Sequence, residues 1–309
     1  MRVPYSYLPQ EFPERSGVVR AINKDMRKLR ESGAYTLGPF VERFEDAWAE
    51  AVGAKYAIGV GSGTDAIKLA LRALGVKGRV ATAGNTFLAT VGAIIEAGCE
   101  PVLCDVDENY LTPEKTFGEM IMSRERPNAI IPVWLTGLMW GPLEKQFITS
   151  MIVDCAQAIG ASSYGVKPGQ VGLAQAWSLH PLKNIVAWGD GGVVTTNDEV
   201  VAEEVRLLRN HGLRDRDTWV KPGYNSRLSA LQAIVAYHHL KNLDAITERR
   251  RENAAFYDEH LSQLPGIVVP PRDPQIIHPF HLYVIQADRR DELVKHLLAD
   301  GIEAKIPYP

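Results

Sequence analysis

The stretch YAIGVGSGTDAIKLALRAL, residues 56–74, decides the fold. An apolar run at 56–60 leads into the small-residue turn Gly61-Ser62-Gly63. Apolar positions spaced as on one face of a helix follow at 64–74. Such a strand–turn–helix unit is typical of an α/β protein. The backbone N–H groups of the turn and the positive end of the helix dipole suit a phosphate group.

The glycine spacing of this turn does not match a dinucleotide-binding fingerprint. Thr64 stands where the pattern G-x-G-x-x-G requires its third glycine. The turn is therefore either a phosphate site of another kind or an ordinary strand–helix connection. Asp65 counts against a phosphate unless its carboxylate points away to cap the helix.

Short apolar runs alternate with helical patterns along the chain, which predicts a mostly parallel sheet flanked by helices. Further strands are expected at 101–104, 129–133, 150–154 and 192–196, and helices at 40–51, 86–97 and from Ser229 to about Leu264.

The C-terminal part changes character after Pro265-Gly266. It predicts a strand over 280–286, a helix over 291–300 and a short strand over 303–306. We therefore expect a large α/β domain over residues 1–245 and a small α+β lobe over 246–309. So small a lobe buries little by itself, and we expect the chain to stop before the lobe is complete.

The composition argues against several classes of protein. The 309 residues carry a net charge of −3, without the basic excess expected of a nucleic-acid binder. No apolar run approaches a signal peptide or a membrane span, so we expect a cytoplasmic protein. Cys99, Cys104 and Cys155 show no metal-type spacing, which favours reduced thiols and no metal site.

Asp154 ends the apolar run 151–153. In open parallel sheets, ligands bind beyond the carboxyl ends of the strands. A carboxylate there can pair with a protonated pyridine nitrogen, so that the ring acts as an electron sink. The other interpretation is a helix cap ahead of Cys155, and the local sequence leaves both open.

Lys183 lies in the segment SLHPLKN, residues 178–184, ahead of the glycine-rich stretch 188–192. A single lysine is normally a surface charge, and His180 alone is more often a structural residue. Taken in order, however, the chain supplies a phosphate turn, the Asp154 carboxylate, the Ser178 hydroxyl and an amine. Pyridoxal 5'-phosphate (PLP) needs a phosphate anchor, a pyridinium partner and an amine nucleophile. The set therefore predicts PLP, with Lys183 forming the Schiff base.

With these residues in these positions, the sequence resembles the DegT/StrS-type nucleotide-sugar aminotransferases, which are PLP enzymes of fold type I. The resemblance runs from about Val3 to Pro309. It is carried by ordered motifs at residues 61–66 (GSGTDA), 85–90 (NTFLAT), 154–158 (DCAQA), 178–184 (SLHPLKN), 189–192 (GDGG) and 223–228 (GYNSRL).

The resemblance implies a role for each matching residue. Lys183 would hold PLP and carry the proton, and Asp154 would pair with the pyridinium nitrogen. The other cofactor contacts would be Gln157 to the ring hydroxyl, Phe87 stacked on the ring, Gly63, Thr64 and Ser178 at the phosphate, and Asn225 at the phosphate of the neighbouring subunit. Tyr35, His180 and Arg227 would border the substrate.

The resemblance further implies a homodimer with shared active sites, glutamate as amino donor and a nucleotide-linked keto-deoxysugar as acceptor, with a lean to amination at C3 over C4. Alternatives on the same fold are a PLP-dependent sugar dehydratase, which has His at the Schiff-base position, and an inactive sensor. Pro307 departs from the family, which commonly has His there, and the family normally continues for several dozen residues beyond Pro309.

Overall fold

The computed structural model describes residues 2–141 and 151–308. The strands are β1 (Tyr56–Val60), β2 (Gly78–Ala83), β3 (Cys99–Cys104), β4 (Ala129–Ile131), β5 (Ile152–Asp154), β6 (Ser162–Ser163), β7 (Ala174–Ser178), β8 (Gly192–Thr196), β9 (Ile267–Val268), β10 (Ile276–Ile277) and β11 (Gln286–Ala287). The helices are α1 (Leu8–Glu11), α2 (Gly17–Ser32), α3 (Pro39–Val52), α4 (Gly63–Ala73), α5 (Leu88–Glu96), α6 (Glu114–Met122), α7 (Glu199–Arg209), α8 (Ala230–Leu240), α9 (Leu243–Leu261) and α10 (Arg290–Ala299).

The central sheet is mostly parallel, as predicted. Strands β3, β2 and β4 pair in parallel, and so do β5 and β7. Parallel bridges from Ile130 to Met151 and from Val133 to Asp154 join β4 to β5. The order is thus β3-β2-β4-β5-β7-β8-β1, and β8 runs antiparallel to both of its neighbours.

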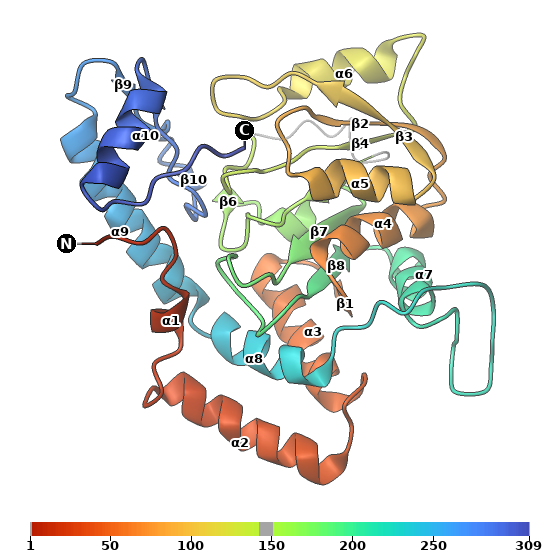
Figure 1. Cartoon of the computed structure of the whole chain (residues 1–309). Coiled ribbons are helices and arrows are strands. Elements are labelled where there is room, and N and C mark those ends of the chain that lie inside the picture. Colours follow the sequence, from red (N-terminus) through yellow and green to blue (C-terminus); the bar gives the residue numbers. More distant parts are fainter. Residues whose placement is uncertain (1, 142–150, 309) are drawn as a thin grey trace.

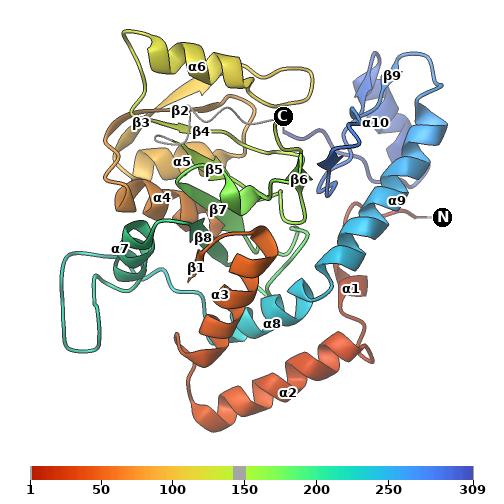
Figure 2. The ribbon, with the colours of Figure 1, turned by 180° about the vertical axis from the view of Figure 1, so that it is seen from behind.

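Helices cover both faces of this sheet, with α4, α5 and α7 on one face and α3 and α8 on the other (Figures 1 and 2). Successive strand residues point to opposite faces. Trp177 and Val193 accordingly pack into the core on the α3 and α8 side. Ala176 and Val194 pack into the core on the α4 and α7 side. Burial on both faces explains why the strand sequences are almost continuously apolar.

Helix α9 runs from the large domain to a small C-terminal lobe built from β9, β11 and α10 (Figure 1). The predicted domain boundary at 245/246 falls within the first turn of α9. The N-terminal segment joins this lobe, because Val3 forms a parallel bridge with Ile302 and Arg2 pairs with Glu303. Among the described helices, none is both long and apolar enough to cross a membrane.

Several predicted elements agree with the structure and three do not. Residues 56–60 and 192–196 form β1 and β8 with the predicted bounds. Of the predicted strand 150–154, Ile152–Asp154 form β5, and Ser150 lies outside the described residues. The helix predicted from Ser229 to Leu264 is interrupted between α8 and α9, where Asn242 N–H donates to His239 O at 2.9 Å.

The predicted strands 280–286 and 303–306 were wrong, since only Gln286–Ala287 form a strand there. The carbonyls of Phe280 and His281 accept from the Arg250 guanidinium at 2.9 and 3.4 Å, so a side chain satisfies part of this backbone in place of a β-ladder.

Candidate active site

The ends of two strands meet at one edge of the sheet. Val60, the last residue of β1, and Ser178, the last residue of β7, both lie opposite Gly192 at the start of β8. Because β8 runs against both neighbours, the carboxyl ends of β1 and β7 emerge together. Asp154 ends β5 beside β7 at the same edge, where ligands bind in open α/β sheets.

The turn between β1 and α4 folds tightly over this edge. A Cβ on Gly63 would lie 2.8 Å from Ser178 Cβ, and a Cβ on Gly192 would lie 2.2 Å from Ser62 O. Both positions therefore require glycine. The side chain of Ser62 caps α4 by accepting from Asp65 N–H at 3.0 Å. This close approach brings Gly63, Thr64 and the Ser178 hydroxyl to one place, as a phosphate site requires.

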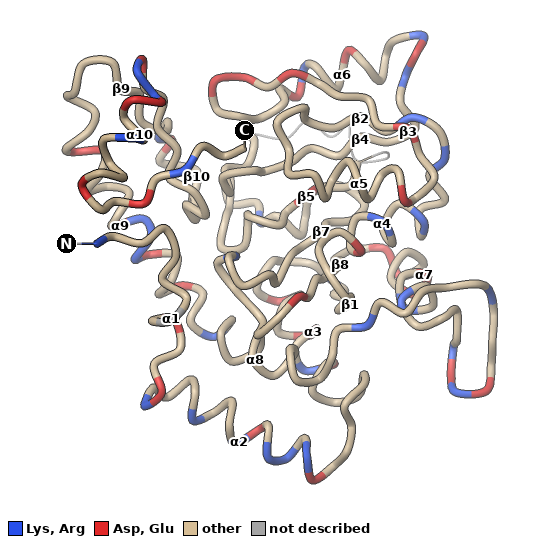
Figure 3. The backbone as a smooth tube through the Cα atoms, in the orientation of Figure 1, with Lys and Arg blue, Asp and Glu red and all other residues tan. Residues whose placement is uncertain are grey.

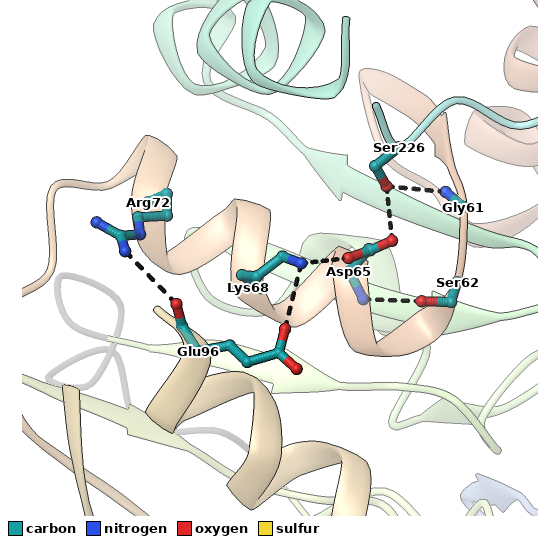
Figure 4. Close-up of polar contacts among 7 residues, drawn as sticks. All are labelled: Gly61, Ser62, Asp65, Lys68, Arg72, Glu96 and Ser226. Atoms are coloured by element: carbon teal, nitrogen blue, oxygen red, sulfur yellow. Dashed lines mark hydrogen bonds and ion pairs between the residues drawn. The ribbon is translucent and has the colours of Figure 1, made fainter. Parts of the chain in front are cut away.

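Asp65 does not cap the helix. Its carboxylate is directed at Ser226, whose hydroxyl donates to Oδ2 at 2.8 Å, and at Lys68, whose Nζ lies 2.6 Å from Oδ1 (Figure 4). The objection that the sequence raised against a phosphate at this turn is thereby removed.

Asp154 is a buried carboxylate with two donors. Thr90 Oγ1 on α5 donates to Oδ2 at 2.7 Å, and Ala156 N–H donates to Oδ1 at 3.1 Å. Burial raises the pKa of Asp154, while the hydrogen bonds from Thr90 and Ala156 and the charge of Lys183 lower it. The carboxylate caps the following turn, as one sequence interpretation predicts, and it also lies at the sheet edge, where the other expects a partner for a pyridine nitrogen.

Lys183 lies in a tight loop held by the backbone. Its N–H donates to His180 O at 2.8 Å, and His180 N–H donates to Ser178 Oγ at 3.3 Å. Burial lowers the pKa of the Lys183 amine, and the Asp154 charge opposes that shift. The amine and the carboxylate therefore lie close enough to influence each other. The imidazole of His180 is exposed and accepts from Leu182 N–H at 3.2 Å.

Gln157 and Phe87 meet at Tyr308. Gln157 Nε2 donates to the Tyr308 hydroxyl at 3.0 Å, and the rings of Phe87 and Tyr308 lie 5.5 Å apart. The Gln157 Oε1 atom is buried without a hydrogen-bond partner among the described residues. Phe87, directly ahead of α5, is 51% exposed.

The other predicted site residues lie along a second segment. Arg227 forms a bridge with Val60, and its guanidinium donates to Asn210 Oδ1 at 2.8 Å. Asn225 is exposed, and Tyr35 lies just ahead of the bridge from Thr36 to Ser229. Nearby, Leu37 and Asn210 line a pocket of about 620 Å³ against α7. These residues are thus close to the end of β1 but come from different loops than Lys183 and Asp154.

Three residues near the site were missed by sequence reasoning. Thr90 holds Asp154, Tyr308 contacts Gln157 and Phe87, and His281 Nδ1 lies 3.1 Å from Asn184 Oδ1, next to Lys183. Burial lowers the pKa of His281 well below its usual range, and the charges of Lys183 and Arg250 add to this. Thr90 lies in the motif 85–90, and that motif was the one signal for it.

The model of the DegT/DnrJ/EryC1/StrS aminotransferase family matches residues 18–309. The chain belongs to this family.

The named relatives of this aminotransferase include a transaminase and a protein with a regulatory name. A protein of Geobacillus stearothermophilus named pleiotropic regulatory protein is 37% identical, over 100% of this chain and 84% of that protein. The dTDP-3-amino-3,4,6-trideoxy-alpha-D-glucose transaminase of Streptomyces venezuelae is 35% identical, over 100% of this chain and 82% of that protein. The crystal structure of S. venezuelae DesV in complex with a ketimine intermediate covers all of this chain and 84% of its own, with 34% identity and a TM-score of 0.90.

The family is PLP-dependent, and so is this aminotransferase. Its residues fit the cofactor. The orphaned Gln157 Oε1 faces no partner of its own, Asp154 is a buried carboxylate near Lys183, and the Gly63 turn packs on Ser178 with no room for a side chain. PLP needs an acceptor for its ring hydroxyl, a carboxylate for its pyridinium nitrogen and a binding site for its phosphate.

Proposed function

We propose that this aminotransferase moves an amino group from glutamate to a nucleotide-linked 3-keto-deoxysugar in amino-sugar biosynthesis. The observation that carries the proposal is the buried Asp154 carboxylate at the edge of the sheet where Ser178, which leads into the Lys183 loop, also ends its strand. The name of the Streptomyces venezuelae relative, a 3-amino-sugar transaminase, supports C3 over C4 and a dTDP-linked substrate class.

The roles of this chain's residues follow from their surroundings. PLP, when bound, supplies an electron sink for the carbanion that forms when a C–H bond next to nitrogen is broken. Lys183 would hold the cofactor covalently, and its amine, once free, would accept and return the proton at the reacting carbon. The lowered pKa of Lys183 favours the neutral amine that this proton transfer needs. Asp154, whose carboxylate accepts from Thr90 and Ala156, would hold the ring nitrogen protonated.

Other residues orient and shield the cofactor. Phe87 would stack on one ring face, and Gln157 would bond the ring hydroxyl through its side-chain amide. Gly63, Thr64 and Ser178 would bind the phosphate at the start of α4, where N–H groups and the helix dipole favour an anion. Tyr35, His180 and Arg227 are proposed substrate contacts.

The presence of Lys183 favours transamination over dehydration, because the related dehydratases have His at this position. An inactive sensor would not need a buried carboxylate beside that lysine, since burying an ionised carboxylate is costly unless it is used.

We also propose a homodimer in which Asn225 reaches the partner's cofactor. Two exposed apolar side chains support an interface: Leu88, which follows Phe87 on α5, is 81% exposed, and Trp219 is 63% exposed. Trp219 lies on the long loop between α7 and α8, which extends from the body of the molecule and carries charges of both signs (Figures 1 and 3). The three buried free thiols suit the cytoplasm.

The test is a substrate screen. The PLP form is mixed with glutamate, and the loss of its visible absorbance reports the first half-reaction. The aminated form is then offered 3-keto and 4-keto sugars linked to dTDP, UDP or GDP, and the return of absorbance identifies the acceptor. Lys183→Ala is the control, because it leaves no amine for PLP to bind. If the absorbance returns only with a 4-keto sugar, the C3 assignment is overturned. If it returns with none of the sugars, a sensor is favoured.

A further inference from the structure

Asp65 is an anion placed close to an anion site. It lies in the first turn of α4, directly after Gly63 and Thr64, which are proposed to bind the cofactor phosphate. A carboxylate in a first helical turn is favoured by the helix dipole. The same carboxylate would repel a phosphate a few ångströms away, and more strongly where solvent is excluded. The direction of its side chain therefore matters for the affinity of PLP.

Two side chains fix that direction. Ser226 Oγ lies 2.8 Å from Asp65 Oδ2, and Lys68 Nζ lies 2.6 Å from Asp65 Oδ1 (Figure 4). Lys68 is only 12% exposed and lies 3.3 Å from Glu96 Oε2. Burial lowers the pKa of Lys68, but the hydrogen bonds and charges of Asp65 and Glu96 outweigh this and raise it. Lys68 is therefore a firmly protonated partner for Asp65.

Ser226 also reaches the turn itself. Its hydroxyl accepts from Gly61 N–H at 3.1 Å. A serine hydroxyl has a single proton, so with the Gly61 bond accepted, that proton is donated to Asp65. Ser226 is 3% exposed, which keeps water from taking over either bond.

The packing separates the carboxylate from the side of the turn that faces Ser178. A Cβ on Gly61 would lie 3.1 Å from Asp65 Oδ2 and 3.2 Å from Ser226 Oγ, whereas a Cβ on Gly63 would meet Ser178. Asp65 thus packs over Gly61, and the proposed phosphate contacts lie at Gly63 and beyond.

We propose that Ser226 and Lys68 are positioning residues for PLP binding, which hold the Asp65 carboxylate over Gly61 and neutralise it so that it does not repel the cofactor phosphate. This inference rests on the proposed phosphate site. It assigns Ser226 a role within its own subunit, while its neighbour Asn225 is proposed to serve the partner.

The experiment compares PLP with pyridoxal, which has the same ring and aldehyde but no phosphate. Dissociation constants of both are measured on the full-length apoenzyme by the absorbance of the bound aldehyde. Ser226→Ala should weaken PLP binding about tenfold, the size expected when a hydrogen bond to a charged group is lost. Pyridoxal binding should not change. Ser226→Ala combined with Asp65→Asn should regain the affinity for PLP, because a neutral amide does not repel phosphate.

Lys68→Met provides a second, independent variant, since it keeps the length of the side chain and removes only the charge. It too should weaken PLP but not pyridoxal, and Asp65→Asn should rescue it. Equal loss of both ligands, or no rescue by Asp65→Asn, would show a merely structural role and overturn the proposal.

Thr64→Ala tests the proposed phosphate site independently of the role of Asp65. If Thr64→Ala leaves PLP affinity unchanged, the proposed phosphate site is wrong, and the inference falls with it. If Thr64→Ala weakens PLP but Ser226→Ala and Lys68→Met do not, the site stands and only the role of Asp65 is refuted.

Discussion

The hydroxyl of Thr90 on α5 donates a 2.7 Å hydrogen bond to the carboxylate of Asp154 at the end of β5. The two residues are 64 positions apart in the sequence, and both are buried. Burial alone would favour the neutral acid, and the Thr90 hydroxyl is the strongest influence in the opposite direction. Thr90 has no proposed contact with cofactor or substrate, yet its hydroxyl lowers the pKa of the carboxylate that is proposed to pair with the cofactor ring.

Thr90→Val should therefore lower kcat by about tenfold or more, because a hydrogen bond to a charged group is worth about 1.5–3 kcal/mol. Losing the donor raises the pKa of Asp154 further, so the acidic limb of the kcat profile should move to higher pH. Thr86→Val is the matched control, since Thr86 Oγ1 lies 2.7 Å from Thr90 Oγ1 and makes no contact of this kind with Asp154. Equal profiles for Thr90→Val and wild type would contradict this role.

Lys183 should react with aldehydes at lower pH than an ordinary lysine, because burial lowers the pKa of its amine and increases the neutral, nucleophilic fraction. The rate at which apoenzyme combines with pyridoxal should rise with pH. It should level off at a lower pH than the range in which the amine of an exposed lysine loses its proton. The measurement is a stopped-flow series across pH.

Asp154→Asn tests the direction in which the charge of Asp154 shifts the pKa of Lys183. The negative charge of Asp154 raises the pKa of Lys183. Removing that charge should lower this pKa, and the plateau should move to still lower pH. A plateau that moves upward would mean that the two groups do not interact as described.

The sequence could propose those candidate residues that lie in continuous segments. Asp154 and Ser178 end strands that are recognisable as apolar runs, and the glycines of 61–63 mark their own turn. Thr90, Tyr308 and His281 reach the site through contacts 64, 151 and 97 residues long, and no local pattern records such pairings. The strand predicted over 280–286 failed for a similar reason, because Arg250 binds the carbonyls of Phe280 and His281 from about 30 residues away along the chain.

A buried ion pair holds the backbone of β1 at Gly59, just ahead of the turn that enters the site. Arg209 on α7 pairs with Glu45 on α3, and both side chains are at most 10% exposed. Glu45 Oε1 accepts from Gly59 N–H at 2.7 Å, and Arg209 donates to Gly59 O at 2.8 Å. Arg209→Met should destabilise the apoenzyme by about 3–5 kcal/mol, because it leaves a buried carboxylate unpaired.

Urea denaturation measures this effect. Adding Glu45→Gln to Arg209→Met should recover part of the loss, since the amide oxygen still accepts from Gly59 without a charge. Arg251→Met, which breaks the exposed pair with Glu248, should cost at most about 1 kcal/mol. A loss of that small size for Arg209→Met would refute the structural importance of the buried pair.

The shared-site arrangement predicts complementation between two impaired homodimers. Lys183 is proposed to serve the cofactor of its own subunit and Asn225 that of the partner. Lys183→Ala and Asn225→Ala homodimers should both be impaired, the second mainly when PLP is limiting, because it loses a phosphate contact and keeps the amine. In a mixed dimer, one site then carries both lesions and the other carries neither. Transamination at limiting PLP should therefore return, up to one working site per dimer.

The measurement uses a heterodimer made by co-expression of the two variants with different tags and isolated on both tags in turn. If Asn225 acted within its own chain, each site of the mixed dimer would carry one lesion, and activity would stay at the level of the homodimers. Ser226 distinguishes the two arrangements further, because it bonds Gly61 and Asp65 of its own subunit. Ser226→Ala placed on the Lys183→Ala subunit should leave the rescued site intact, whereas on the Asn225→Ala subunit it should weaken PLP at the only working site.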